Sequence, residues 1–144
     1  MGNDYPVRRS IRLRGFDYSS NNLYFVTICT QGREPILSKV VGDRAFMSPY
    51  GRIVDTEWSK LMDRFTMIEL DEYVIMPNHI HGIIGIRATV KVAPTLGQII
   101  GAYKSMVVRT CLEMAKTNDK YMGKLWQRNY YEHIINPWRL SEGF

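Results

Sequence analysis

Two histidines, His79 and His81, are the residues of this sequence most suited to chemistry. They lie in the segment YVIMPNHIHGIIGI, where two apolar runs meet at a Pro77-Asn78 corner. Successive side chains of a strand point to opposite faces, so both histidines share one face while Ile80 points into a core. Neutral imidazole is a common ligand of divalent metals. The spacing therefore predicts a paired-histidine metal site, although two polar residues on a half-exposed strand would show the same spacing.

Hydrophobic periodicity indicates the elements that position this pair. A helix is expected over residues 48–65, and a second helix begins at Thr95, which forms a capping box with Gln98. Residues 31–43 are expected to be irregular, and residues 87–93 to form a loop. Runs rich in aromatic and β-branched residues predict four strands. The strands are expected at residues 23–30, 67–76, 79–86 and 125–135.

The order strand, helix, strand, strand, helix, strand defines an α+β fold. With a hairpin in the middle and a helical crossover on either side, the simplest arrangement is ferredoxin-like. That arrangement is a four-stranded antiparallel sheet with two helices on one face. The histidine-bearing third strand would then be central.

Composition is that of one compact domain. The chain has 144 residues, of which 45% are hydrophobic, so we expect a single domain over residues 1–144. It would carry a basic arm over residues 1–20 and a short, possibly truncated tail over residues 136–144. No run has the length of a membrane span or the form of a secretory signal, which predicts a cytoplasmic protein without a membrane partner. Cys29, expected mid-strand, and Cys111, expected on a helix, are predicted to be buried and not disulfide-bonded.

The positive charge is concentrated where an anionic partner could use it. The net charge is +5, and the segment RRSIRLR places Arg8, Arg9, Arg12 and Arg14 in one short stretch. Arginine forks match phosphate oxygens, so the arm is a candidate for backbone contacts with nucleic acid. Lys104 and Arg109 lie largely off the apolar stripe of the second helix. They form either a solvated face or a further phosphate-contacting one.

Several blocks resemble the single-tyrosine transposases of the HUH class, in which two histidines flank a hydrophobic residue. MPNHIHGII resembles the HUH signature, and RRSIRLRGFDYS, YFVTICTQGRE and LWQRNYYEHII resemble the branch of REP-associated tyrosine transposases. The blocks occur in the family's order from about Arg8 to Ile135. The resemblance therefore covers nearly the whole chain.

The resemblance implies an enzyme that cleaves and transfers single-stranded, often hairpin-forming DNA. His79 and His81 would hold Mg²⁺ or Mn²⁺ against the scissile phosphate, and a tyrosine would attack to give a 5′-phosphotyrosine link. The partner would be single-stranded or hairpin DNA. Members of the family include both monomers and homodimers.

The nucleophile is where this sequence departs from the family pattern. Relatives carry it on a helix after the strand that matches LWQRNYYEHII, with an Asn or Gln one turn later that completes the metal shell. Here NPWRLSEGF follows Ile135, and no tyrosine comes after Tyr131. Tyr131 and Asn136 are five positions apart where the family pattern has four. We therefore assign no catalytic residue, keep Tyr131 as a fallback, and expect His133 to be a strand surface residue and not a third ligand.

Two alternatives stay open on the sequence alone. The first is a non-catalytic module for single-stranded or hairpin DNA, in which the basic residues contact the backbone and exposed aromatics stack on bases. The second is an RNA-binding domain of RRM type, which would use Tyr24 and Phe25 on the first strand. YFVTICT lacks the RNP pattern, and the paired histidines would be unexplained in such a domain.

Overall fold

The fold contains the predicted order of strands and helices, with a short hairpin in addition. The structure is a computed structural model that describes residues 22–87, 95–118 and 123–135. Its strands are β1 (Asn22–Cys29), β2 (Ser38–Val41), β3 (Arg44–Met47), β4 (Ile68–Met76), β5 (His79–Ile86) and β6 (Tyr131–Ile135). Its helices are the 3₁₀ turn η1 (Gln31–Arg33), α1 (Pro49–Ser59), α2 (Leu61–Arg64) and α3 (Leu96–Thr117).

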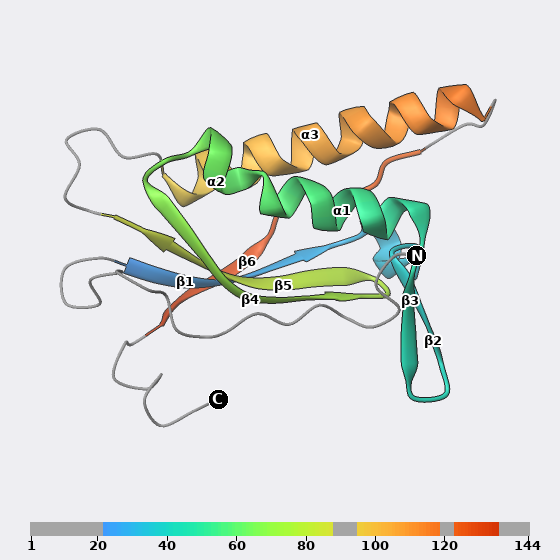
Figure 1. The fold of residues 1–144 in the computed structure, drawn as a ribbon, viewed down its shortest axis with the longest axis horizontal. Coiled ribbons are helices and arrows are strands. Elements are labelled where there is room, and N and C mark those ends of the chain that lie inside the picture. The colour runs from blue at the N-terminus through green and yellow to red at the C-terminus, as the bar shows by residue number, and fades with distance from the viewer. Residues whose placement is uncertain (1–21, 88–94, 119–122, 136–144) are drawn as a thin grey trace.

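The main sheet has four antiparallel strands in the order β4-β5-β1-β6. This order and the helices on one face confirm the ferredoxin-like prediction (Figure 1). β5 lies between β4 and β1, so the histidine-bearing strand is central, as expected. Thr27 pairs with His81 across one side of β1 and with Tyr131 across the other. Paired residues lie on the same face, so these three side chains stand in one row.

The helix layer packs on the face of the sheet opposite the histidines. Trp58 of α1 is fully buried and makes an edge contact with Tyr103 of α3, with ring centroids 5.3 Å apart. A Cβ atom on Gly82 would lie 2.3 Å from Cζ2 of Trp58. Only glycine fits at that position of β5 without movement of the indole. The HIHG sequence thus places two candidate ligands on one face of β5, and on the other face Gly82 leaves the space that the Trp58 ring occupies.

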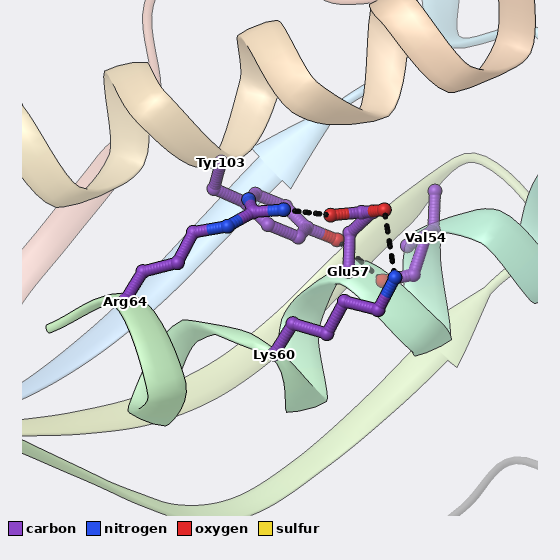
Figure 2. Close-up of polar contacts among 5 residues, drawn as sticks. All are labelled: Val54, Glu57, Lys60, Arg64 and Tyr103. Carbon is purple, nitrogen blue, oxygen red and sulfur yellow. Dashed lines mark hydrogen bonds and ion pairs between the residues drawn. The ribbon is translucent and has the colours of Figure 1, made fainter.

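A buried carboxylate connects the two short helices (Figure 2). Glu57 of α1 accepts a hydrogen bond from Arg64 of α2 at 3.0 Å and lies 3.8 Å from the ammonium of Lys60. Nearby, the Tyr103 hydroxyl donates to the Val54 carbonyl at 2.8 Å, which ties α3 to α1. These contacts lie in the helix layer, on the opposite side of the sheet from the two histidines. We assign them to the fold.

The structure corrects three predicted boundaries. Residues 31–43, expected to be irregular, contain η1 and β2, and β2 forms a hairpin with β3 that projects from the body (Figure 1). The single helix expected over residues 48–65 is interrupted at Lys60, which separates α1 from α2, and Met62 of α2 is exposed. The strand expected over residues 125–135 is regular only from Tyr131, although Trp126 forms an isolated bridge with Thr30.

The remaining predictions of the core agree with the structure. The capping box of Thr95 and Gln98 is present at the start of α3. Cys29 and Cys111 are both buried and free, although Cys29 ends β1 and is not mid-strand. Among the helices within the described residues, none has both the length and the apolar character that a bilayer crossing needs.

Candidate metal centre and its surroundings

The two histidines meet at their Nε2 atoms, which lie 2.9 Å apart. They belong to the face of β5 that the helices leave uncovered, and both side chains are half-buried. Their ring centroids are 4.3 Å apart, and the ring planes are inclined at 72°. The sheet register thus brings the two Nε2 atoms within hydrogen-bond distance of each other, as the alternation of side chains along a strand predicts.

The other nitrogen of each ring is held by a polar side chain. His79 Nδ1 lies 2.7 Å from the Asn78 carboxamide oxygen, and His81 Nδ1 lies 2.8 Å from the Thr27 hydroxyl. The carboxamide oxygen can only accept, so His79 carries its proton on Nδ1 and presents a bare Nε2. The Thr27 hydroxyl can donate or accept, so it serves either tautomer of His81. Such contacts fix the ring orientation that metal-ligating histidines need.

The local environment keeps both imidazoles neutral. Burial lowers the pKa of His79, and the nearby charges of His81 and Arg33 lower it further. Burial alone lowers the pKa of His81. Neutral imidazole is the form that binds a metal ion. The pair is therefore in its ligating state at neutral pH.

The donor set fits a small divalent cation. Two ligands at right angles, each about 2.1 Å from an octahedral ion, would be about 3.0 Å apart, close to the 2.9 Å observed. Among the described residues no cluster of three His, Cys, Asp or Glu side chains surrounds the site. A pair of nitrogens leaves coordination positions for water and for phosphate oxygens, and Mg²⁺ commonly binds through few protein ligands.

A network of backbone contacts fixes the corner that carries the pair. The Thr30 amide and hydroxyl both donate to the Asn78 carbonyl, at 3.0 and 3.1 Å. The Asn78 carboxamide nitrogen donates to the Arg33 carbonyl at 3.4 Å. Arg33 has a positive φ of 53°, a conformation that non-glycine residues rarely adopt. The exposed Arg33 thus belongs to the surroundings of His79.

The sequence prediction missed Thr27, Asn78 and Arg33 as parts of this site. Asn78 directly precedes His79 in the sequence, so this adjacency could have indicated Asn78 as a partner of the His79 ring. Thr27 is 54 residues away from His81 and becomes its neighbour only through the pairing of β1 with β5. Arg33 comes near through η1, which the sequence prediction treated as irregular.

The predicted DNA-contacting residues lie elsewhere. Arg8, Arg9, Arg12 and Arg14 fall outside the described residues. Lys104 and Arg109 line a groove of about 850 Å³ between α3 and residues 123–128, on the helix side of the sheet. Lys104 donates to the Gln127 and Arg128 carbonyls at 2.7 and 3.2 Å, so it also holds this segment in place. The other cations that line the groove are Lys116, Lys124 and Arg128, beside one carboxylate, Glu113.

Tyr131 and His133 share the uncovered face with the histidine pair. Tyr131 is 57% exposed, and β1 separates its strand from β5. Two strand spacings place its Cα about 10 Å from that of His81. The His133 ring stacks on Phe25 at 5.2 Å and 21°, and Phe25 lies between it and His81. His133 is thus an exposed strand residue, as expected. Asn136 lies outside the described residues.

Comparison with known proteins identifies the family. Residues 19–137 match the family described as "Transposase IS200 like". The chain is 34% identical over 146 residues to an uncharacterized protein of Haemophilus influenzae (strain ATCC 51907 / DSM 11121 / KW20 / Rd), and the match covers 89% of this chain and 78% of that protein. This chain belongs to the IS200-like transposase family, and the resemblance to REP-associated tyrosine transposases is confirmed at that level.

Two solved structures share the fold. The first is a REP-associated tyrosine transposase bound to a REP hairpin, with a TM-score of 0.60 and 14% identity. The match covers 91% of this chain but 66% of that one, just under two thirds of its length. The second is a putative transposase from Deinococcus radiodurans R1, with a TM-score of 0.55 and 18% identity, and it covers 91% of this chain and 90% of that one.

Proposed function

We propose that this chain binds single-stranded or hairpin DNA, with His79 and His81 holding a divalent ion, Mg²⁺ or Mn²⁺, against one phosphate. The observation that carries the proposal is the 2.9 Å approach of the two Nε2 atoms, with each Nδ1 bound to a fixed partner. Membership of the transposase family supports DNA as the ligand. So does the hairpin in the solved structure of a protein with this fold. The site of action would be the cytoplasm.

The residues of the metal centre would divide ion binding, ring orientation and phosphate attraction among them. When bound, the ion supplies Lewis-acid polarisation of a phosphodiester. His79 and His81 would hold it, and Asn78 and Thr27 would orient their rings. Arg33 would attract the phosphate from the neighbouring turn, because a guanidinium matches phosphate oxygens.

The basic groove and the arm would hold the rest of the DNA. We propose backbone contacts for Lys104 and Arg109 in the groove and for Arg8, Arg9, Arg12 and Arg14 in the arm. Neutralising a phosphate with a cation releases condensed counterions, so binding through these residues weakens with salt. An Arg9→Gln, Arg12→Gln variant is therefore expected to show a shallower dependence of affinity on salt, and an unchanged slope would remove the arm from the interface.

Strand cleavage would require a tyrosine at the metal centre. Its phenolic oxygen would form a bond to phosphorus as the P–O3′ bond breaks, the phenol would lose its proton, and the 3′ oxygen would leave as a hydroxyl. Among the tyrosines of the described strands, Tyr131 is the one on the face of the histidine pair. It is the candidate nucleophile that the described residues offer.

The alternative is a DNA-binding module without covalent chemistry. The position of Tyr131 two strands from His81 favours it, because the intervening β1 keeps the phenol away from the pair. One assay separates the two functions: incubation with hairpin DNA and Mn²⁺, followed by denaturing electrophoresis. An adduct that is absent in Tyr131→Phe would establish cleavage by this tyrosine. Salt-sensitive binding without an adduct would establish the module, and stronger binding to RNA of the same sequence would contradict both.

A further inference from the structure

The hairpin of β2 and β3 has an exposed face of mixed apolar and basic character. Lys39 pairs with Phe46 across the hairpin, and Val41 pairs with Arg44. Paired residues share a face, and so do residues two apart along a strand, so these four side chains lie together. All four are exposed, whereas Ala45 on the opposite face is buried against the body. We call the face of these four residues the outer face of the hairpin.

The base of the hairpin is fixed to the corner that carries the histidine pair. The Leu37 amide donates to the Pro77 carbonyl at 2.9 Å, and the Ser48 amide donates to the Leu37 carbonyl at 2.9 Å. Leu37 is fully buried, and a Cβ atom on Gly51 of α1 would lie 2.0 Å from its carbonyl oxygen. The first turn of α1 therefore packs directly on this base. The corner that positions His79 thus also positions the hairpin.

The hairpin extends to the side of the sheet that lies away from α1 and α3 (Figure 1). That is the side of the uncovered face, to which His79 and His81 belong. The exposed turn η1, which carries Arg33 near His79, precedes the hairpin in the chain. A DNA strand with one phosphate at the histidine pair would therefore meet the hairpin where it passes the Pro77-Asn78 corner.

Two side chains of the outer face are open to a ligand. Phe46 is 37% exposed, belongs to neither core cluster, and has no other aromatic ring of the described residues packed on it. Lys39 is exposed and forms no ion pair within the part of the chain that the structure describes. The acidic residue of the hairpin, Asp43, lies in its turn. The outer face thus offers an accessible aromatic ring beside an unpaired ammonium group.

This combination suits a nucleic-acid strand better than a protein surface. In proteins that bind single strands, bases stack on exposed aromatic rings and cations contact the backbone. A specific protein interface buries about 800 Å² on each partner, an area that four side chains of a short hairpin do not supply. The attachment of the hairpin to the corner of the candidate metal centre favours the same ligand for both.

We propose that the outer face of the hairpin binds single-stranded DNA next to the phosphate at the metal centre, with Phe46 stacked on a base and Lys39 at a backbone phosphate. The inference rests on the proposed function, because the contacted nucleotides would belong to the strand that the histidine pair holds through its ion. Every base has a face that can stack, so this contact adds affinity without selecting a sequence.

Fluorescence anisotropy with a labelled single-stranded oligonucleotide of mixed sequence, in the presence of Mn²⁺, tests the assignment. Phe46→Ala should weaken binding by about fivefold or more, whereas Phe46→Tyr should keep the parent's affinity because its ring also stacks. Lys39→Gln should reduce the dependence of log affinity on log salt by about one. Arg52→Gln removes a charge from an exposed position of α1, in the helix layer, and should keep the parent's slope.

Two neighbouring valines provide a matched control within the hairpin. Val41 lies on the outer face at 54% exposure, and Val40 lies on the opposite face at 55% exposure. Either residue can be replaced by glutamate, which adds the same charge at nearly the same distance from the base. In 0.15 M salt, which screens charges beyond about 8 Å, Val41→Glu should weaken DNA binding by about fivefold or more and Val40→Glu by less than about twofold.

Three results would overturn the inference and leave the proposed function standing. The first is parental DNA affinity in Phe46→Ala together with a parental salt slope in Lys39→Gln. The second is equal weakening by Val40→Glu and Val41→Glu, which would remove the preference for the outer face. The third is a loss of Mn²⁺ affinity in Phe46→Ala as large as in His79→Ala, which would place its effect at the metal centre. Failure of the parent to bind the strand would instead refute the proposed function, and this inference with it.

Discussion

Replacing Asp71 with asparagine should stabilise this protein at neutral pH. Asp71 is 2% exposed in the bulge of β4, and neither carboxylate oxygen has a hydrogen-bond partner of ordinary geometry among the described residues. Burial raises its pKa from 3.8 to about 6; the Glu72 backbone N–H partly opposes the rise and the Glu72 carboxylate adds to it. Ionising this group in the folded protein is therefore unfavourable.

The size and the sign of the effect follow from the two pKa values. A raised folded-state pKa means that the protonated carboxyl contributes stability below pH 3.8, and this contribution is lost as the pH rises through about 6. A shift of about two units corresponds to about 3 kcal/mol of folding free energy above pH 7. At pH 5 the folded group is still mostly protonated, so roughly half of the loss has occurred. Asp71→Asn removes the ionisation with little change in shape.

Urea unfolding of Asp71→Asn at pH 7.5, 5 and 3.5 measures this effect. We expect a gain of about 2–3 kcal/mol at pH 7.5 that shrinks to about half at pH 5 and nearly vanishes at pH 3.5. Asp63→Asn, at an exposed position of α2, should change stability by less than about 0.5 kcal/mol at each pH. A loss of stability in Asp71→Asn at pH 7.5, or a gain that is the same at every pH, would refute the reasoning.

Three further predictions concern the site and the groove. Gly82→Ala should lower the free energy of unfolding by about 1–3 kcal/mol, because its Cβ would lie 2.3 Å from the Trp58 ring. In thermal denaturation, adding Trp58→Phe to the same chain should restore part of this loss, and additive effects of the two substitutions would contradict the clash. Thr27→Val should weaken Mn²⁺ binding by about 10-fold or more in a titration and leave the fold intact, and unchanged affinity would show that the hydroxyl does not orient His81. Lys104→Met should lose about 1–2 kcal/mol in urea unfolding, because its hydrogen bonds to two backbone carbonyls, one of them part-buried, disappear. Arg109→Gln should keep its stability and reduce the salt slope of DNA binding by about one; the reverse pattern would exchange their roles.

The sequence alone predicted those features that depend on neighbouring residues, such as strand alternation and helix capping. Alternation along a strand placed both histidines on one face, and apolar flanks made their strand central. The capping box gave the start of α3. The hairpin of β2 and β3 also had a local signal, because Gly42-Asp43 separates two short runs and Gly42 has a φ of 64°. The prediction of irregular structure over residues 31–43 overlooked this turn signal.

The remaining differences arise from contacts between distant segments. Leu125 and Trp126 have strand composition, yet both side chains are buried in the core with the helices. The sequence left Lys104 on either a solvated or a phosphate-contacting face, but in the structure it donates to the carbonyls of residues 127 and 128. Thr27 becomes a neighbour of His81 only through strand pairing. Composition alone does not encode these pairings.

The most direct test of the account is a Mn²⁺ titration of the chain and three histidine variants, followed by the electron paramagnetic resonance signal of free Mn²⁺. We predict one binding site in the parent, weakened by about 10-fold or more in His79→Ala and in His81→Ala. His133→Ala, on the same face but beyond Phe25, should bind as the parent does. If both His79→Ala and His81→Ala bind Mn²⁺ with the parent's affinity, the paired histidines are not a metal centre and the proposed function is wrong.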